Sequence, residues 1–191
     1  EAMRGLFEGT RQLFIHVNNV KGIKSAVLFA QQFGVQAVIV GGRDAWMITD
    51  FLKEQEVSIV LQQPHSLPHL MHTYIDQTFR TPAVLHEAGI PFCFSMGGFW
   101  EQRNLPFQAG QAVAYGLPYE AAVAALTSQT AKVLQLENFG TLTQGMDATL
   151  IVSRGDALDV RSNQIVLAFI QGRQIDLDDK QKMLYRKYRD K

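Results

Sequence analysis

The sequence predicts an α/β fold built on a parallel sheet, and two observations carry that prediction. Short apolar runs rich in β-branched residues alternate with amphipathic stretches along residues 13–136. The runs are almost continuously apolar, which is typical of strands that helices cover on both faces. The predicted strands are residues 13–17, 35–40, 57–61 and 91–95.

Apolar residues at helical spacing predict the helices between these strands. Residues 2–11 read as the end of a helix that leads to the first strand. Residues 20–33 follow Asn18 and Asn19, which have capping chemistry, and stop at Gly34, the usual residue just past a helix. The other predicted helices are residues 44–55, 78–89, 105–115 and 118–136.

The pattern changes after Gly140. Residues 147–153 and 164–170 are predicted strands joined by a charged connection rich in turn residues, and Gly172 with Arg173 begins another turn. Residues 176–191 predict an exposed terminal helix with a basic end. The predicted domains are therefore residues 1–136 with the βα units, residues 137–175 with a β segment, and residues 176–191 with the terminal helix.

Residues 1–136 contain about four βα units, half of the eight that close a (β/α) barrel. Right-handed crossovers place the loops that follow the strands at one edge of the sheet, where α/β proteins bind their ligands. An open half-barrel leaves two unpaired strand edges, which invite aggregation. We therefore expect either a missing N-terminal half, since the chain starts inside a helix-like segment without methionine, or a tight homo-oligomer.

Composition narrows the classes of partner. The 18 basic and 18 acidic side chains balance, which argues against nucleic acid or an anionic membrane and leaves a small-molecule ligand as the partner class to consider. No apolar run is long enough to cross a bilayer, and the first residues lack the features of a signal peptide, so the compartment is undefined. Cys93 is the only cysteine, which excludes an internal disulfide and a cysteine zinc cluster within one chain.

The C-terminal part of the sequence carries a family resemblance. Residues 125–136 (ALTSQTAKVLQL), 139–160 (FGTLTQGMDATLIVSRGDALDV) and 170–175 (IQGRQI) resemble the closing segment of the metal-dependent amidohydrolase superfamily, particularly its imidazolonepropionase-like branch. In that family a helix reading A-L-T-x-N-x-A-x-x-L-G leads to G-x-L-x-x-G-x-D-A-D-L-V. Here Gln129 replaces the usual asparagine and Thr149 the second aspartate. The resemblance implies a (β/α)₈ TIM-type barrel of which this chain supplies units five to eight, with part of a small β-sandwich.

The chemistry that the resemblance implies is hydrolysis of carbon–nitrogen bonds other than peptide bonds by a water that zinc or another divalent metal activates. In the family the metal is held by His-x-His on the first strand, by histidines ending the fifth and sixth strands, and by an aspartate ending the eighth that shuttles the proton. His16 matches the fifth-strand histidine, whereas Gly41 and Gly97 stand at the next two positions. Glycine cannot coordinate a metal, so the sequence predicts a defective or absent metal centre in this chain. The alternative is a non-catalytic small-molecule-binding or scaffold homologue that keeps the barrel pocket.

Histidines are the first group of candidate site residues. His16 is either a metal ligand or a hydrogen-bonded histidine that lines a pocket. His65, His69 and His72 have the spacing of one helical face and resemble a metal site, but Pro68 lies among them. The plainer interpretation places these residues, within the long loop 62–77, in a lid over the barrel mouth.

Three further groups of candidate residues lie within the predicted strands or directly after them. Gly41 and Gly42 either cradle an anion or form a tight turn, and Arg43 and Asp44 could touch a ligand, although a helix cap is the plainer role for Asp44. Cys93 has the position of a buried structural thiol. The loop after the fourth strand borders the expected active-site face and supplies the remaining pocket candidates, Trp100, Glu101 and Arg103.

Overall fold

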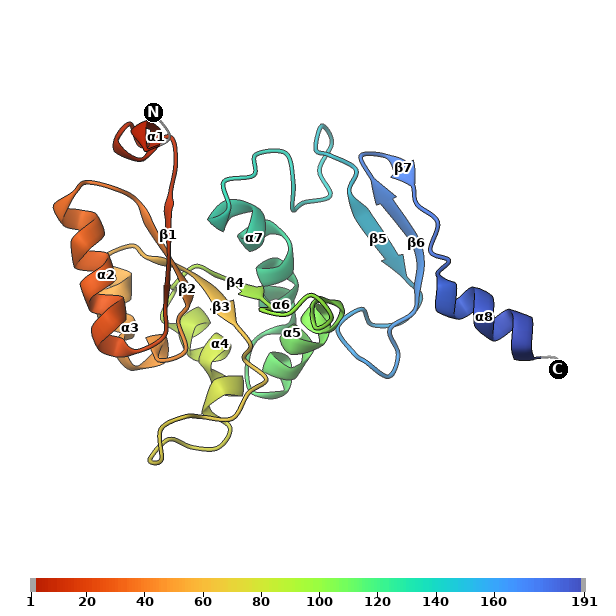
Figure 1. The fold of residues 1–191 in the computed structure, drawn as a ribbon, viewed down its shortest axis with the longest axis horizontal. Helices are drawn as coiled ribbons and strands as arrows, with labels where there is room; N and C mark the ends of the chain where they lie inside the picture. The colour runs from red at the N-terminus through yellow and green to blue at the C-terminus, as the bar shows by residue number, and fades with distance from the viewer. Residues whose placement is uncertain (1–2, 190–191) are drawn as a thin grey trace. The chain divides into compact units, whose positions relative to one another are not determined.

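The computed structural model describes residues 3–189, which form two compact units that divide between Thr141 and Leu142. The first unit contains the strands β1 (Leu13–Val17), β2 (Ala37–Gly41), β3 (Ser58–Gln62) and β4 (Phe92–Ser95) (Figure 1). Its helices are α1 (Arg4–Phe7), α2 (Val20–Gln32), η1 (Ala45–Ile48), α3 (Thr49–Glu54), α4 (Gln77–Glu87), η2 (Gln102–Asn104), α5 (Leu105–Ala114), α6 (Tyr119–Leu126) and α7 (Ser128–Val133).

The four strands pair in the order β1-β2-β3-β4, and every pair is parallel. The order follows the sequence without reversal. A doubly wound fold reverses its strand order at a switch point, whereas a barrel winds in one direction. The predicted α/β fold with a parallel sheet is therefore confirmed. All four strands end at one edge of the sheet, which we call the carboxyl edge.

The two faces of this sheet are packed differently. Register places Val40, Val60 and Cys93 side by side on one face, where they form a buried cluster with Val38 and with Val133 of α7. On the other face Ile39 and Ile59 are completely buried, as are Ile23 of α2, Leu52 of α3 and Leu85 of α4. Burying a side chain of this size contributes about 1.5–3 kcal/mol.

One face of β1 is left exposed to solvent. Its register with β2 puts Phe14 and His16 on the same face as Val38 and Val40, yet both side chains are exposed while the valines are buried. β1 and β4 are the outer strands, and no further strand among residues 3–189 pairs with either of them. The sheet thus has two free edges.

The N-terminus of α2 is capped as the sequence predicts. Asn19 has extended backbone angles, and its Oδ1 accepts a hydrogen bond of 2.8 Å from the Gly22 amide. Past the other end of the helix, Gly34 adopts a φ of +62°, a conformation that glycine reaches without strain.

Replacing Asn19 with alanine is expected to lower the free energy of unfolding by about 1 kcal/mol, because the Gly22 amide loses its acceptor. Urea unfolding followed by circular dichroism measures this. Asn104→Ala is the matched control, since Asn104 precedes α5 but its side chain makes no capping hydrogen bond. Equal losses in the two variants would contradict the assigned cap.

Three predicted elements differ from the structure. The helix predicted over residues 118–136 is two helices, α6 and α7, because Thr127 leaves helical geometry with φ −128° and ψ −94°. The hydroxyls of Thr127 and Thr130 donate to the carbonyl oxygens of Val123 and Ala125, a local competition that disturbs helices. The segment 44–55 begins as a 3₁₀ turn, η1, before α3. Arg173, expected in a turn, begins a strand.

The second unit contains an antiparallel sheet of three strands, β5 (Leu150–Ser153), β6 (Ile165–Ile170) and β7 (Arg173–Gln174), followed by helix α8 (Lys180–Arg189). The first two strands and the helix lie where the sequence predicts them; Ala2 of the first predicted helix and residues 190–191 of the last lie outside the described residues. α8 buries no side chain.

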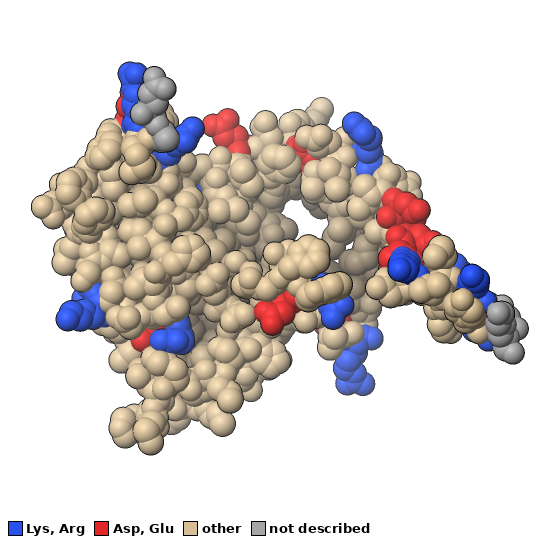
Figure 2. Space-filling model, in the orientation of Figure 1, with Lys and Arg blue, Asp and Glu red and all other residues tan. Residues whose placement is uncertain are grey.

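Charge is spread over the surface. On the face shown in Figure 2, separate Lys, Arg, Asp and Glu side chains dot the first unit, and both signs occur at the C-terminal helix. No helix among residues 3–189 is long and apolar enough to cross a membrane.

Candidate functional site

Backbone hydrogen bonds join the strand ends at the carboxyl edge. The Gly42 amide donates to the Val17 carbonyl at 2.9 Å, and the Gln63 amide donates to the Ser95 carbonyl at 3.3 Å. The loops after all four strands therefore start close together. This is the edge at which parallel α/β proteins bind their ligands.

A charged cluster of Arg43, Asp44 and His69, here named the Arg43 cluster, lies beyond the end of β2. The Arg43 Nε lies 3.3 Å from Asp44 Oδ1, and a guanidinium nitrogen of Arg43 lies 2.9 Å from His69 Nε2. Arginine only donates, so Nε2 of His69 accepts and the ring proton of neutral His69 is on Nδ1. That nitrogen lies 3.8 Å from Asp44 Oδ1.

Asp44 has a different role from the helix cap that the sequence suggests. Its side chain makes no capping hydrogen bond to η1, so that prediction is wrong. The Asp44 carboxylate is 7% exposed and faces both Arg43 and His69. A buried carboxylate needs such partners, because an unpaired charge is costly away from water. The cluster thereby fastens the long loop to the end of β2.

The long loop after β3 is irregular, so the histidines do not share a helical face. The His65 amide donates to Gln108 Oε1 at 2.8 Å, and its ring meets Phe79 edge-on at 5.1 Å. His69 belongs to the Arg43 cluster, and His72 is exposed. The structure therefore brings His69 to the carboxyl edge but does not bring the three histidines together. The assignment of these residues to a lid stays a prediction.

Gly41 and Gly97 occupy very different surroundings. Gly41 has φ +105°, and a Cβ there would lie 2.6 Å from Asn18 Oδ1 and 3.0 Å from the Val17 carbonyl oxygen. A side chain at this position is therefore strained. Gly97 lacks a positive φ, and a Cβ there would meet only Gln63 Nε2 at 3.7 Å. The tight-turn interpretation of Gly41 is thus supported by sterics, whereas Gly97 could accept a side chain.

The donor set at the strand ends does not fit a zinc or other divalent ion. His16 is exposed at the end of β1, and its neighbours at the expected ligand positions are Gly41 and Gly97. Within residues 3–189, no three His, Cys, Asp or Glu side chains gather in a metal-binding arrangement. A zinc site needs three or four such donors around one point. His16 therefore has no partner ligands in this part of the chain.

The loop after β4 places one of its three candidates at the carboxyl edge. Glu101 Oε2 accepts a hydrogen bond of 3.1 Å from Gln63 Nε2, which follows β3. Trp100 is 71% exposed and contacts Phe99 edge-on, and Arg103 is exposed in η2. Sequence reasoning missed Gln63 and Gln108 as residues that order these loops. A polar residue directly after an apolar strand is the signal that could have found Gln63.

The hollows beside Arg43 are too small for a substrate. Two hollows border Arg43, one beside His69 and one beside Gln63, and each has a volume of about 10 Å³. That is room for about one water molecule, whereas small-molecule sites usually measure about 300–1,000 Å³.

Cys93 is the buried structural thiol that the sequence predicts. It is 2% exposed within the cluster on β2–β4. Burial raises its pKa to about 11, and a hydrogen bond with Thr130 lowers it by less. The thiol is therefore protonated at neutral pH and is not a nucleophile.

Cys93 is expected to resist alkylation by iodoacetamide at pH 8 in the folded protein and to react fully in denaturant. Because the pKa of Cys93 in the folded protein lies above its ordinary value of 9.0, stability is unaffected below about pH 9 and falls as pH rises from there through about 11. Mass spectrometry of the labelled protein measures the first effect and urea titration against pH the second. Rapid labelling of the native protein would contradict this assignment.

Comparisons with known proteins give fold relatives only. No protein-family model matches the sequence, and no curated protein does. Among solved structures, an amidohydrolase from Thermotoga maritima matches with a TM-score of 0.78 and 24% identity over 91% of this chain and 45% of its own. A prolidase complexed with N-methylphosphonate-L-proline gives a TM-score of 0.62 and 17% identity over 86% and 45%. A mutant atrazine chlorohydrolase from Arthrobacter aurescens, complexed with zinc and atraton, gives 0.56 and 15% over 92% and 47%.

These likenesses define the class of fold. The chain has the fold of a part of each of these structures and spans less than half of the length of each. The fold resemblance predicted from the sequence is confirmed to that extent. The imidazolonepropionase-like branch stays a prediction.

Proposed function

We propose that this chain is the C-terminal half of an amidohydrolase-type (β/α)₈ barrel and belongs to a hydrolase that acts on carbon–nitrogen bonds other than peptide bonds. The observation that carries the proposal is the unreversed, all-parallel order of four strands, superposable with a TM-score of 0.78 on 45% of an amidohydrolase. Four is half of the strands of such a barrel. The family resemblance of residues 125–175 supports the same assignment.

An N-terminal barrel half supplies the remaining strands in this proposal. The exposed Phe14 and His16 on β1 and the free edges of β1 and β4 are features that four further strands would cover. A second copy of this chain would also bring four strands, but it would repeat Gly41 and Gly97 instead of adding ligands. We therefore favour the N-terminal half over a homo-oligomer.

The residues of this chain bind and orient rather than hold a metal. Arg43 presents a cation at the carboxyl edge, and Asp44 with His69 fixes its position. A guanidinium at this place suits a carboxylate or a developing oxyanion on the substrate. Glu101, held by Gln63, adds an acceptor beside the end of β4. The groups that activate water come, in this proposal, from the N-terminal half.

A non-catalytic small-molecule-binding homologue is the second candidate, and Gly41 favours it. The backbone at Gly41 strains any side chain, so the turn after β2 disfavours a ligand at this position. A protein with this turn keeps the barrel scaffold and the Arg43 cluster but has no sixth-strand histidine. It would bind an anionic small molecule without cleaving it.

One experiment separates the two candidates. The protein at its full encoded length is incubated with small cyclic amides, such as hydantoin and dihydrouracil, with and without zinc, and ring opening is followed by mass spectrometry. The first candidate predicts turnover that falls about tenfold or more in Arg43→Met and is unchanged in Arg80→Met, because Arg80 pairs only with Asp76 on the surface of α4. Binding of the anionic ring-opened products, N-carbamoylglycine and N-carbamoyl-β-alanine, without turnover of the cyclic amides would favour the second candidate.

A further inference from the structure

The long loop after β3, residues 62–77, is fixed at both of its ends. Near its start the His65 amide donates to Gln108 Oε1 at 2.8 Å, and the Thr78 hydroxyl donates to the Ser66 carbonyl oxygen. Its other end continues into α4 at Gln77. Amide, carboxamide and hydroxyl groups keep the same protons at any pH near neutrality. The two ends are therefore held in the same way in mild acid and mild base.

The middle of the loop, residues 67–75, is held weakly by comparison. Its large apolar side chains are mostly exposed, with fractions from 74% to 97% for four of them: Leu67, Met71, Tyr74 and Ile75. Within the described part of the chain, one hydrogen bond joins this stretch to a segment other than the loop itself and α4, and it runs from Arg43 to His69. A segment with few buried contacts opens easily, so the position of residues 67–75 depends on His69.

The contact between Arg43 and His69 requires a neutral imidazole. A guanidinium nitrogen of Arg43 lies 2.9 Å from His69 Nε2, and because arginine only donates, Nε2 is the acceptor. A protonated histidine carries a hydrogen on both ring nitrogens and accepts no hydrogen bond. Protonation of His69 therefore removes this hydrogen bond and leaves two cations in contact.

One carboxylate, that of Asp44, faces both of these cations. Its Oδ1 lies 3.3 Å from Arg43 Nε and 3.8 Å from His69 Nδ1. The other described residues that line the hollow beside His69, on η1, on the loop and on α4, are uncharged. Charge interactions weaken with distance, and the guanidinium lies nearer to the ring than the carboxylate does. Asp44 therefore does not cancel the repulsion between Arg43 and a protonated His69.

We propose that the contact between Arg43 and His69 is a proton-operated latch. While His69 is neutral, the latch holds residues 67–75 against the end of β2. When His69 takes up a proton, this stretch detaches and the Arg43 guanidinium is freed from one of its two partners. Histidine changes its charge between about pH 5 and pH 8, so mild acid opens the latch. The latch concerns the position of the loop and does not rest on the proposed function, so its tests need no substrate.

Substitutions of fixed charge test the latch at one pH. His69→Lys carries a cation at neutral pH, whereas His69→Gln supplies a side-chain oxygen that accepts from Arg43 at any pH. Chymotrypsin is applied to the protein at its full encoded length, and cleavage after Tyr74 is followed by mass spectrometry. Cleavage is expected to be about tenfold faster in His69→Lys than in the unmodified protein, the effect of losing one hydrogen bond from a charged group, and unchanged in His69→Gln.

His72→Lys is the matched control for His69→Lys, because it adds the same charge at an exposed position of the same loop. It is expected to leave the cleavage rate unchanged. Cleavage of His69→Lys no faster than that of the unmodified protein would overturn the latch. Cleavage of His69→Gln as fast as that of His69→Lys would also overturn it, since the hydrogen-bond acceptor would then not be what holds the loop.

The fluorescence of Trp46 tests the response to acid itself. Trp46 lines the hollow beside His69, and Trp100→Phe leaves it as the only tryptophan. Between about pH 8 and pH 5 its emission is expected to shift to longer wavelength as the loop uncovers it, and adding His69→Gln is expected to abolish the shift. No shift in Trp100→Phe, or a shift that persists with His69→Gln, would overturn the latch.

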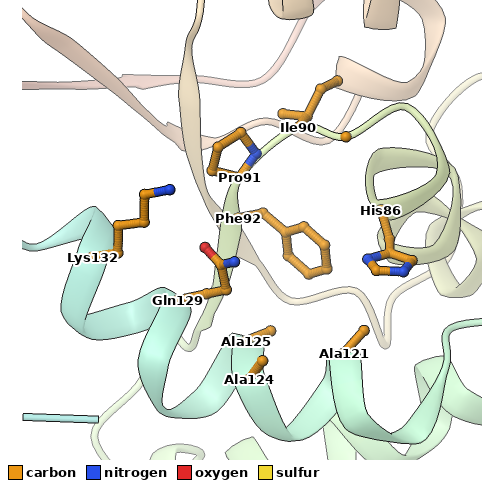
Figure 3. A pocket seen from close by; sticks show the side chains of 10 residues that line it. His86, Ile90, Pro91, Phe92, Ala121, Ala124, Ala125, Gln129 and Lys132 are labelled. Carbon is orange, nitrogen blue, oxygen red and sulfur yellow. The ribbon is translucent and has the colours of Figure 1, made fainter. Parts of the chain in front are cut away.

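His86→Gln is the control for this titration. Figure 3 shows His86 beside the Phe92 ring, in a cavity of about 290 Å³ where β4 begins. His86 lies in the last turn of α4, at the other end of this helix from the loop. The Trp46 shift is therefore expected to be the same with and without His86, and a shift lost in His86→Gln would show that the acid response does not come from the latch.

Discussion

Replacing Gly41 with alanine is expected to lower the free energy of unfolding by about 2 kcal/mol or more. A non-glycine residue at φ +105° carries backbone strain of about 1–3 kcal/mol. The new Cβ would also lie 3.0 Å from the Val17 carbonyl oxygen, a backbone atom that cannot rotate away. Urea unfolding followed by circular dichroism measures the loss.

Gly97→Ala is the matched control, and its effect is expected to stay within about 0.5 kcal/mol. A Cβ at this position meets only Gln63 Nε2 at 3.7 Å. Comparable destabilisation in both variants would show that the contrast between the two glycines is wrong. The same contrast implies that a carboxylate can be introduced at Gly97 but that a histidine cannot be introduced at Gly41 without rebuilding the turn.

The exposed apolar surface of α2 gives the second large effect. Leu28 and Phe29 of α2 and Phe33, which follows the helix, are 54%, 52% and 49% exposed, and α2 contacts the outer strand β1. In a closed barrel a neighbouring helix would cover this surface. Phe29→Glu is therefore expected to lower the free energy of unfolding of the full-length protein by about 2 kcal/mol, the contribution of burying a large apolar side chain.

Met71→Glu is the control for Phe29→Glu. Met71 is 97% exposed in the loop after β3, and its replacement is expected to change stability by no more than about 0.5 kcal/mol. Urea midpoints of the two variants are compared with that of the unmodified protein. A Phe29 variant as stable as the Met71 variant would mean that nothing packs on α2.

Much of the parallel sheet could be predicted from the sequence because local signals are strong there. Continuous apolar runs define β1 to β4 to within a few residues, and Asn19 and Gly34 mark the ends of α2 through their own backbone chemistry. The break between α6 and α7 could not be predicted in this way. It depends on the hydroxyls of Thr127 and Thr130, which bond to the preceding turn instead of to solvent.

The location of the candidate site could be predicted from the sequence, but the residues that contact one another there could not. The strand ends identify the carboxyl edge, and Gly41 and Gly97 identify two positions without ligands. The pairing of Arg43 with His69 joins residues 26 apart through an irregular loop, and that of Gln63 with Glu101 joins residues 38 apart. Such contacts depend on loop conformation, for which periodicity carries no signal.

Amide hydrogen exchange at β1 tests the half-barrel most directly. The Leu13 amide donates to the Gln36 carbonyl beside β2, and in a parallel pair alternate residues face the same neighbour, so the amides of Phe14 and His16 point to the free edge. In the full-length protein we expect these two amides to exchange as slowly as those of Ile15 and Val17, because a strand of the N-terminal half pairs with them. Exchange of Phe14 and His16 at the rate of an exposed loop, with Ile15 and Val17 protected, would contradict the closed barrel.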